Sequence, residues 1–241
     1  MAFTLLIPAH NEAPVIRDTL NTLTEVFERE LGSDWNIIVI DNASTDGTGN
    51  TAKEVVHPCI HVLTLAEKGK GHAVREGARR AQTEWVGYTD SDLSVPPADI
   101  VEAFRLAKRN NLDAVLGSRF HKKSTSRERE WWRTASSHLF HLLAQMIVGV
   151  RATDTQCPLK IINTKARNIL LETKDATWFF DLEFIKMTEM DSLRIEEISV
   201  SWDEHRYPER KSKVHAVKDG VRSIAAMWRI RENIAKRTKA S

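Results

Sequence analysis

Two carboxylates one residue apart, Asp90 and Asp92, are the side chains best suited to chemistry in this sequence. They follow the apolar run 85–89, which predicts a buried strand, and Pro96-Pro97 marks the start of a helix. Carboxylates at this spacing repel each other unless a cation or hydrogen-bond donors compensate them. Hard oxygen ligands suit Mg²⁺ or Mn²⁺, usually shared with substrate phosphates. The alternative interpretation is a solvated turn or a helix cap, so the rest of the chain must decide.

Strand and helix patterns alternate along the first half of the chain. The predicted strands cover residues 3–7, 36–40, 60–65, 85–89 and 113–117, and the predicted helices cover 14–31, 48–56, 71–81 and 97–109. The order is less regular afterwards, with helices over 131–149, 164–172 and 180–190, strands over 159–162 and 194–200, and a long final helix. This alternation indicates an α/β fold with a mostly parallel central sheet and helices on both faces.

Several of the predicted strands end in polar loops. The first strand runs into residues 8–12, the second into 41–48, and the fourth into the acidic pair. If the strands are parallel, these loops converge on one edge of the sheet, where open α/β sheets bind ligands. The alternative for each loop is ordinary turn chemistry, with Asp46 or Thr48 capping the next helix. Turn chemistry is a good explanation for any one of these loops, but a weaker explanation for all of them together.

A further candidate is the segment 67–72, in which Gly69 and Gly71 allow close backbone approach at a predicted helix N-terminus, with Lys68 and Lys70 nearby. Such a segment can hold a phosphate or the edge of a nucleobase. The alternative is a flexible basic turn.

Composition gives bounds rather than a function. The chain has 241 residues, 41% hydrophobic and 28% charged residues, and a net charge of +2, which provides no global argument for nucleic-acid binding. Cys59 and Cys157 are isolated, so we expect neither a zinc site nor a disulfide framework, and a reducing cytoplasm fits. The chain enters a strand at once, without a basic leader, and no apolar stretch approaches the ~20 residues of a spanning helix. We therefore expect any membrane contact to be peripheral.

These residues together resemble the inverting glycosyltransferases of family 2, which have the GT-A fold. The segments that carry the resemblance are residues 7–12, 39–48 and 90–92. Within the family, the chain is similar to polyprenyl-phosphate sugar synthases, and above all to dolichyl-phosphate glucosyltransferases. The segments that carry this narrower resemblance are 69–71, 117–119, 154–160, 178–183 and the stretch from Trp202 to Lys213.

The chain departs from that pattern in several places. The eukaryotic glucosyltransferase has an N-terminal membrane anchor that is missing here, Pro158 stands where glycine is usual, and residues 206–210 lengthen the last loop. The QxxRW signature of processive polysaccharide synthases is absent, which argues against chain elongation.

The resemblance implies one GT-A domain over 1–241, with a nucleotide-sugar half in 1–120 and an acceptor half in 121–241. Asp92 would bind the Mg²⁺ or Mn²⁺ ion that bridges the donor diphosphate, and Asp90 would contact the ribose or the metal. Asp41 would hold the nucleobase or ribose. The other implied donor-binding residues are Pro8, Ala9, Asn11, Glu12, Lys70 and Ser91. Lys211 and Lys213 are candidates for stabilising the leaving diphosphate from a closing loop, and the alternative for both is a solvated charge.

A phosphate acceptor changes the catalytic requirement. A phosphate monoester has a second pKa of about 6, so it is already an oxyanion nucleophile at neutral pH and needs no dedicated base. Arginines must instead bring two anions together. Arg119 matches the acceptor-phosphate position of the family, and Arg133, with Ser137 on the same helix face, is a second candidate.

Two apolar segments suit a lipid acceptor. The first contains Trp131, Trp132, Leu139, Phe140, Leu142, Leu143, Met146, Ile147 and Val148. In the final helix, Val214, Val217, Val221, Ile224, Ala225 and Trp228 form a stripe accompanied by basic residues. Amphipathic helices of this kind lie in the membrane interface and favour anionic surfaces. The alternatives are core packing and a dimer contact.

We therefore predict an enzyme that transfers one glucose from UDP-glucose to a polyprenyl phosphate at the cytoplasmic membrane face. One alternative is a polyprenyl-phosphate mannose synthase that uses GDP-mannose. Another is a soluble family 2 enzyme acting on a saccharide or protein hydroxyl, for which Asp154 or Asp181 would be the base. A non-enzymatic peripheral membrane or nucleotide-binding module is the remaining alternative. We expect no nucleic-acid partner, and the sequence leaves a homo-oligomer open.

Overall fold

The computed structural model describes residues 2–120, 125–127, 131–203 and 216–240, with side chains described for all of these except 125–127, 131–138, 203, 216–221 and 240. Its centre is a seven-stranded sheet in the order β3-β2-β1-β4-β7-β5-β8. The strands are β1 (Phe3–Ala9), β2 (Trp35–Asn42), β3 (Ile60–Leu65), β4 (Trp85–Tyr88), β5 (Ala114–Ser118), β7 (Lys160–Ile162) and β8 (Ile195–Ser199). A second sheet pairs β6 (Thr125–Arg127) with β9 (Ser201–Asp203) in parallel.

Strand direction explains how the site is built. β7 is antiparallel to both of its neighbours, β4 and β5, whereas the other neighbouring strands of the large sheet are parallel. β4 and β5 therefore point the same way as β1 and β2. The carboxyl ends of all of these strands reach one edge of the sheet, as the sequence predicted.

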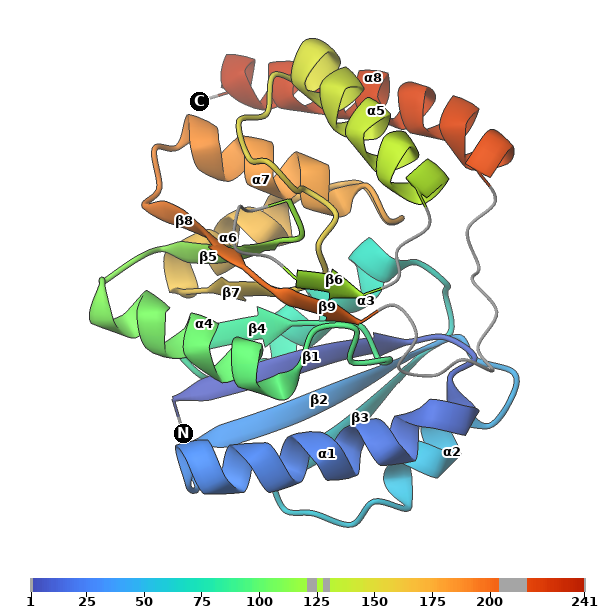
Figure 1. Ribbon diagram of the computed structural model, residues 1–241, viewed down its shortest axis with the longest axis vertical. Coiled ribbons are helices and arrows are strands. Elements are labelled where there is room, and N and C mark those ends of the chain that lie inside the picture. Colours follow the sequence, from blue (N-terminus) through green and yellow to red (C-terminus); the bar gives the residue numbers. More distant parts are fainter. Residues whose placement is uncertain (1, 121–124, 128–130, 204–215, 241) are drawn as a thin grey trace.

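Helices cover both faces of the sheet (Figure 1). One face carries α1 (Ala13–Leu31), α2 (Thr48–Lys53) and α4 (Pro97–Arg109), and the other carries α3 (Lys70–Arg80), α6 (Thr164–Glu172) and α7 (Phe180–Met190). Two further helices, α5 (Trp131–Val148) and α8 (Ala216–Ala240), pack against each other and form an outer layer beyond α7 (Figure 1).

The core alternates along each strand. In β1, Phe3, Leu5 and Ile7 pack on the α1 and α4 side, whereas Leu6 packs on the α3 side. Because both faces are covered, the central strands are nearly continuous apolar runs. Proline residues stand in the first turn of both α1 and α4, where a missing N–H costs nothing. The Asn163 side chain caps α6 by accepting from backbone N–H groups of the first turn.

The element predictions are confirmed with a few corrections. The predicted strand 194–200 is β8, whereas β6 and β9, which form the second sheet, were not predicted. The predicted helix 48–56 ends at Lys53, three residues earlier than predicted. Cys59 and Cys157 are free and buried. None of the helices in the described part of the chain combines the length and apolar composition that a membrane crossing requires.

Candidate active site

The loops that follow β1 and β2 are joined by hydrogen bonds. Asn11 Oδ1 accepts from the Thr45 N–H at 2.8 Å, and Ser44 Oγ accepts from the Asn11 N–H at 3.0 Å. The Glu12 N–H donates to Thr48 Oγ1 at 2.8 Å. The sequence placed these loops side by side, and the structure does bring them together. Asp46 Oδ1 also accepts from the Thr48 N–H at 3.0 Å, a contact typical of a turn, although the N-cap residue of α2 is Gly47.

Asp41 lies at the end of β2, in register with Ala9 of β1. Its side chain is buried, and its Oδ1 accepts from the Ser44 N–H at 3.1 Å. A Cβ at Gly49 would overlap the Asp41 carboxylate, so only glycine leaves the space that this carboxylate occupies. The geometry thus fixes Asp41 beside the loop of residues 8–12.

The acidic pair lies at the end of β4. Asp90 Oδ1 accepts from Lys70 Nζ at 2.6 Å, and the Asp90 side chain keeps 32% of its surface exposed. Asp92 Oδ1 accepts from the N–H of Ser94 at 3.1 Å and from its Oγ at 2.8 Å. Ser91 between them is buried, and its carbonyl accepts from Thr19 Oγ1 at 2.5 Å. The pair therefore sits on a turn whose backbone is anchored to α1.

Lys70 supplies positive charge to this edge. Burial would lower the pKa of its ammonium group, but the Asp90 carboxylate, with smaller contributions from Asp181 and Asp92, raises the pKa above its ordinary value. Lys70 is therefore a stable cation between the acidic pair and the ring of Trp178, whose centroid lies 5.8 Å from Nζ. The resemblance implied a donor-binding role for Lys70, and the structure places it on Asp90.

The glycines of 69–71 approach protein backbone. The Gly71 N–H donates to Ala176 O at 3.0 Å, and a Cβ at Gly71 would lie 2.6 Å from Phe180 Cβ. A Cβ at Gly69 would lie 2.5 Å from Ala176 O. The prediction that this segment holds a phosphate or the edge of a nucleobase stays a prediction. Close approach is indeed required here, but the approaching group is the loop before α7.

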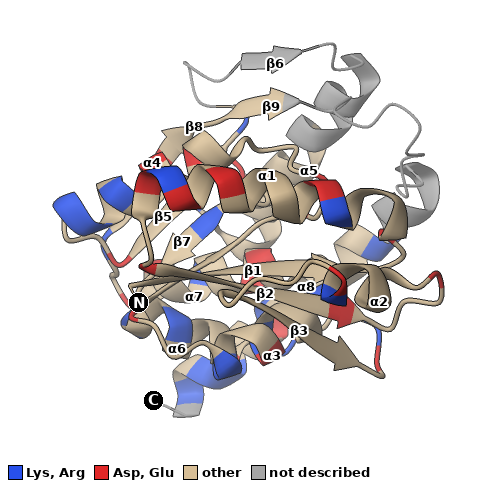
Figure 2. Cartoon of the chain, turned by 90° about the horizontal axis from the view of Figure 1, so that it is seen from below, with Lys and Arg blue, Asp and Glu red and all other residues tan. Residues whose placement is uncertain are grey.

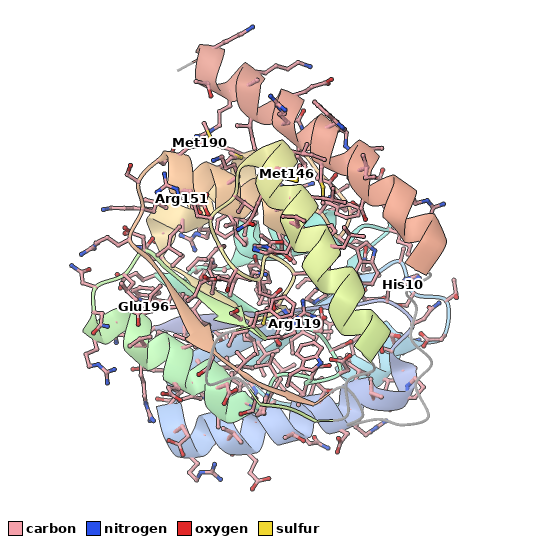
Figure 3. The ribbon with its side chains drawn as sticks, turned by 45° about the horizontal axis from the view of Figure 1, so that its top comes forward. His10, Arg119, Met146, Arg151, Met190 and Glu196 are labelled. Atoms are coloured by element: carbon pink, nitrogen blue, oxygen red, sulfur yellow. The ribbon has the colours of Figure 1, made fainter. Side chains whose placement is uncertain are left out.

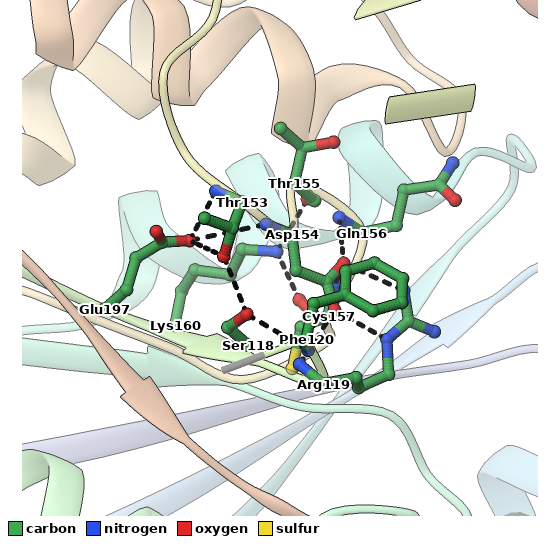
Figure 4. Close-up of polar contacts among 10 residues, drawn as sticks. All are labelled: Ser118, Arg119, Phe120, Thr153, Asp154, Thr155, Gln156, Cys157, Lys160 and Glu197. Atoms are coloured by element: carbon green, nitrogen blue, oxygen red, sulfur yellow. Dashed lines mark hydrogen bonds and ion pairs between the residues drawn. The ribbon is translucent and has the colours of Figure 1, made fainter. Parts of the chain in front are cut away.

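Arg119 lies directly after β5 and makes a two-pronged ion pair with Asp154 (Figure 4). Arg119 Nε donates to Asp154 Oδ2 at 2.7 Å and Nη2 donates to Oδ1 at 2.8 Å, while the guanidinium lies 5.0 Å from the ring centre of Trp202. Burial would raise the pKa of Asp154, but the Arg119 charge and hydrogen bonds lower it below its ordinary value. Asp154 therefore stays ionised and accepts a proton poorly, which argues against the base role considered for a hydroxyl acceptor.

Side chains from two neighbouring strands bind the loop that carries Asp154 (Figure 4). Glu197 Oε1, from β8, accepts from the Thr153 N–H at 2.8 Å and the Asp154 N–H at 3.3 Å. Lys160 Nζ donates to Thr155 O at 3.0 Å and also to Cys157 O. The position of Arg119 therefore depends on both β7 and β8.

Lys160 and Tyr88 were not proposed as functional residues from the sequence. Lys160 is fully buried, and its Nζ lies 3.4 Å from Asp181 Oδ1, which accepts a 2.6 Å hydrogen bond from Tyr88 Oη. Burial raises the pKa of Asp181 even though the charges of Lys160 and Lys70 oppose the shift. A lysine in the apolar run 159–162 was the available signal, since buried lysines are rare unless paired.

The acidic pair follows β4 and Arg119 follows β5, two strands that point the same way, so both lie at the same edge of the sheet. The side chains of Arg133 and Ser137, and both Lys211 and Lys213, lie outside the described residues. Within the described part of the chain, no group of three or more His, Cys, Asp or Glu side chains could hold a metal. Two carboxylates nevertheless fit Mg²⁺ or Mn²⁺, which take their remaining ligands from substrate phosphates and water.

The outer helices expose apolar side chains. In α5, which lies at the front in Figure 3, Leu139, Leu142 and Met146 are 58%, 52% and 72% exposed. In α8, Ile224 and Trp228 are exposed, whereas a second stripe of Ala226, Met227, Ile230 and Ile234 is buried. Core packing, the alternative for this segment, applies to part of it, because Val148 is buried and Phe140, Leu143 and Ile147 pack against the core.

Comparisons with known proteins agree with this geometry. The sequence pattern of the family described as glycosyl transferase family 2 matches residues 4–168. Dolichyl-phosphate beta-glucosyltransferase of Dictyostelium discoideum is 25% identical and covers 94% of this chain and 76% of the relative. Its namesake from Drosophila melanogaster is 29% identical, covering 85% and 68%. The chain spans 66% of the length of the Saccharomyces cerevisiae protein of the same name, with 27% identity over 83% of this chain.

Solved structures establish the fold. Glucosyl-3-phosphoglycerate synthase of Mycobacterium tuberculosis, crystallised with Mn²⁺, UDP-glucose and phosphoglyceric acid, matches with a TM-score of 0.68 at 17% identity. The match covers 95% of this chain and 79% of that chain. The predicted GT-A fold is thereby confirmed.

Proposed function

Because this chain belongs to glycosyl transferase family 2, we propose that it is an inverting enzyme that moves one glucose from UDP-glucose to a polyprenyl phosphate. The relatives named dolichyl-phosphate beta-glucosyltransferase support the donor sugar and the class of acceptor. The single observation that carries the proposal is the shared edge of the sheet, at which the acidic pair follows β4 and Arg119 follows β5.

The donor would lie over the ends of β1, β2 and β4. Asp41 would hold the nucleobase or ribose, and Asp90 and Asp92 would hold Mg²⁺ or Mn²⁺ against the diphosphate. When bound, this ion would supply the positive charge that the leaving diphosphate requires. The proposed donor contacts from the rest of the chain are Pro8, Ala9, Asn11, Glu12, Lys70, Ser91, Lys211 and Lys213.

The acceptor phosphate would bind at Arg119. An arginine has several N–H donors in a planar fork, and the Asp154 pair fixes that fork in one orientation. Arg133 and Ser137 remain proposed partners for the same phosphate. Attack by a phosphate oxygen on C1 of the glucose would form the new C–O bond as the UDP oxygen leaves, which inverts that carbon.

The fate of the two alternative bases favours a phosphate over a hydroxyl acceptor. Asp154 is tied to Arg119, and Asp181 is buried between Tyr88 and Lys160. A hydroxyl nucleophile would require one of them to accept a proton in an exposed position. A phosphate monoester requires no base, because it is already ionised at neutral pH.

A lipid acceptor also gives a reason for the exposed apolar side chains of α5 and α8, which we propose lie on the cytoplasmic membrane face. Trp228 lies beneath Arg231, with 5.2 Å between the guanidinium carbon and the ring centre, a pairing suited to the headgroup region. A dimer contact through the same surface remains the competing use of these helices.

The test is transfer from radiolabelled UDP-glucose to a purified polyprenyl phosphate with Mg²⁺ or Mn²⁺ present. We expect an acid-labile lipid-linked glucose, and we expect its formation to stop when the metal is chelated. GDP-mannose and a set of soluble saccharides are the parallel substrates. The absence of product with every polyprenyl phosphate would overturn the proposal, and a mannosyl lipid from GDP-mannose would replace the donor assignment.

A further inference from the structure

Trp178 is a large apolar side chain beside the charged edge, and it remains 56% exposed. Its ring lies 5.8 Å from Lys70 Nζ, and the same Nζ donates to Asp90. An indole combines a wide apolar face with one N–H donor, so it suits a boundary between a polar and an apolar environment. Trp178 thus occupies the rim of the proposed reaction centre.

The loop that presents Trp178 is fixed on both sides. The Gly71 N–H donates to Thr177 O at 3.1 Å as well as to Ala176 O, and Arg75 Nη1 donates to Asp175 O at 2.7 Å. Thr177 Oγ1 also donates to Asp175 Oδ1 at 2.5 Å. The exposure of the indole is therefore a property of a tightly bonded loop, and the rim position is built into the fold.

The next residue leads away from the charges toward α5. Phe179 stacks on Phe140 of α5, with 6.1 Å between the ring centres. On the same helix, Leu139, Leu142 and Met146 are exposed. Trp178 therefore stands where a polar edge with a cation and carboxylates meets an exposed apolar helix surface.

We propose that the Trp178 indole contacts the first isoprene units of the acceptor, so that the lipid leaves the site between Trp178 and α5. This inference rests on the proposed function and assigns the position of the lipid next to its phosphate. An amphiphile with an anionic head and an apolar chain matches the change of chemistry across the rim. The sugar ring of the donor fits it less well, because sugar hydroxyls need polar partners and the Phe179–Phe140 side offers aromatic carbon.

The experiment compares wild-type protein with Trp178→Ala and Trp178→Phe, using citronellyl phosphate and a longer polyprenyl phosphate as acceptors in detergent. For Trp178→Ala we expect the KM for either acceptor to rise about tenfold, since apolar contact worth roughly 1.4 kcal/mol corresponds to that factor. The kcat and the KM for UDP-glucose should stay near the wild-type values. Trp178→Phe should retain most of the acceptor affinity, because it keeps an aromatic face.

Met190→Ala is the matched control, since Met190 is an exposed apolar residue at the far end of α7 and should leave both KM values unchanged. Calorimetric binding of citronellyl phosphate without donor gives a readout that does not depend on turnover. A rise in the KM for UDP-glucose alone, or unchanged acceptor KM and affinity in Trp178→Ala, would overturn the inference. If the wild-type protein neither glycosylates nor binds any prenyl phosphate, the proposed function fails and the inference fails with it.

Discussion

Asp92 shows how one carboxylate serves both the turn and the proposed chemistry. Its Oδ1 accepts two hydrogen bonds from Ser94, and an asparagine oxygen can accept the same bonds. The Asp92→Asn variant should therefore keep its fold and lose the negative charge that a divalent ion needs. We expect kcat to fall by at least about 100-fold, with a melting temperature close to that of the wild type.

The matched variant is Ser94→Ala, which removes the hydroxyl contact and keeps the carboxylate. It should retain most of the turnover. Wild-type activity in Asp92→Asn would exclude a metal role for this side chain.

The Arg119–Asp154 pair has a consequence for stability against pH. Because the pKa of Asp154 is lowered in the folded protein, its charge contributes stability above the unfolded pKa of about 3.9, and this stability is lost as the pH falls through the folded value. Asp154→Asn leaves the nearly buried Arg119 without its counterion, which costs about 3–5 kcal/mol for a buried pair. We expect a lower melting temperature at neutral pH and a smaller loss of stability between about pH 4 and pH 2.

Thermal unfolding across that pH range, for both proteins, measures this difference. Asp18→Asn is a suitable control on α1, an element that does not carry the pair. Equal slopes of melting temperature against pH in wild type and Asp154→Asn would contradict the assignment of a lowered pKa to Asp154.

At the scale of elements, α3 is joined to the loop before α7 through a glycine. Gly71→Ala would place a Cβ 2.6 Å from Phe180 Cβ and close to Asp175 O, and the backbone on that side is held by hydrogen bonds. Overpacking of this kind costs about 1–3 kcal/mol, although alanine favours helix more than glycine does. We expect a lower free energy of unfolding by denaturant titration, together with weaker donor binding, because Lys70 precedes the displaced residue.

His72→Ala, one position further along the same helix, is the comparison for this change. It removes a half-buried side chain without adding a contact, and its effect on stability should be smaller. If Gly71→Ala were as stable as the wild type, the loop before α7 would be able to move away, contrary to the close packing described above.

The order of the elements could be predicted because each strand or helix has its own local pattern. Residues 159–162 were recognised as a strand, but their antiparallel direction was not, since an apolar run reads the same either way. The glycines at 69 and 71 were correctly interpreted as a close approach, but the loop that packs against them could not be predicted, because it lies about 100 residues later in the chain. Local patterns thus predict the elements, and long-range partners decide what the elements contact.

The same limit applies to the candidate site. Asp41, Asp90, Asp92 and Arg119 could be chosen because polar side chains at strand ends share an edge in a parallel sheet. The support beneath them could not be chosen in this way. Glu197 and Lys160 act through backbone groups of residues 153–157, which carry no sequence signal, so even the conspicuous lysine in the apolar run 159–162 did not reveal its partners.

At the scale of the whole molecule, the reactive edge and an exposed apolar surface lie close together. The sheet directs its polar strand ends to one edge, and α5 and α8 form the layer beyond α7 (Figure 1). Basic side chains recur toward the end of α8 (Figure 2), and its last turn contains Arg237 and Lys239. Arg237 pairs with Glu172 and with Asp191 at the C-terminal end of α7, so this basic stretch lies away from the acidic pair.

This arrangement predicts binding to anionic vesicles through α5 and α8. The double variant Leu142→Asp and Trp228→Ala replaces two side chains that are each about half exposed, so folding should be little affected. We expect co-flotation with phosphatidylserine-containing vesicles to fall at least about tenfold, since each apolar side chain withdrawn from the interface removes roughly 1–2 kcal/mol. Added salt should weaken wild-type binding, because exposed basic residues attract the surface through screened charges.

Val56→Asp, on a fully exposed apolar residue beside α2, is the control and should float like the wild type. Unchanged flotation of the double variant would contradict this prediction. If the wild-type protein then sediments as a dimer and the double variant as a monomer, the surface is a contact between two copies of the chain.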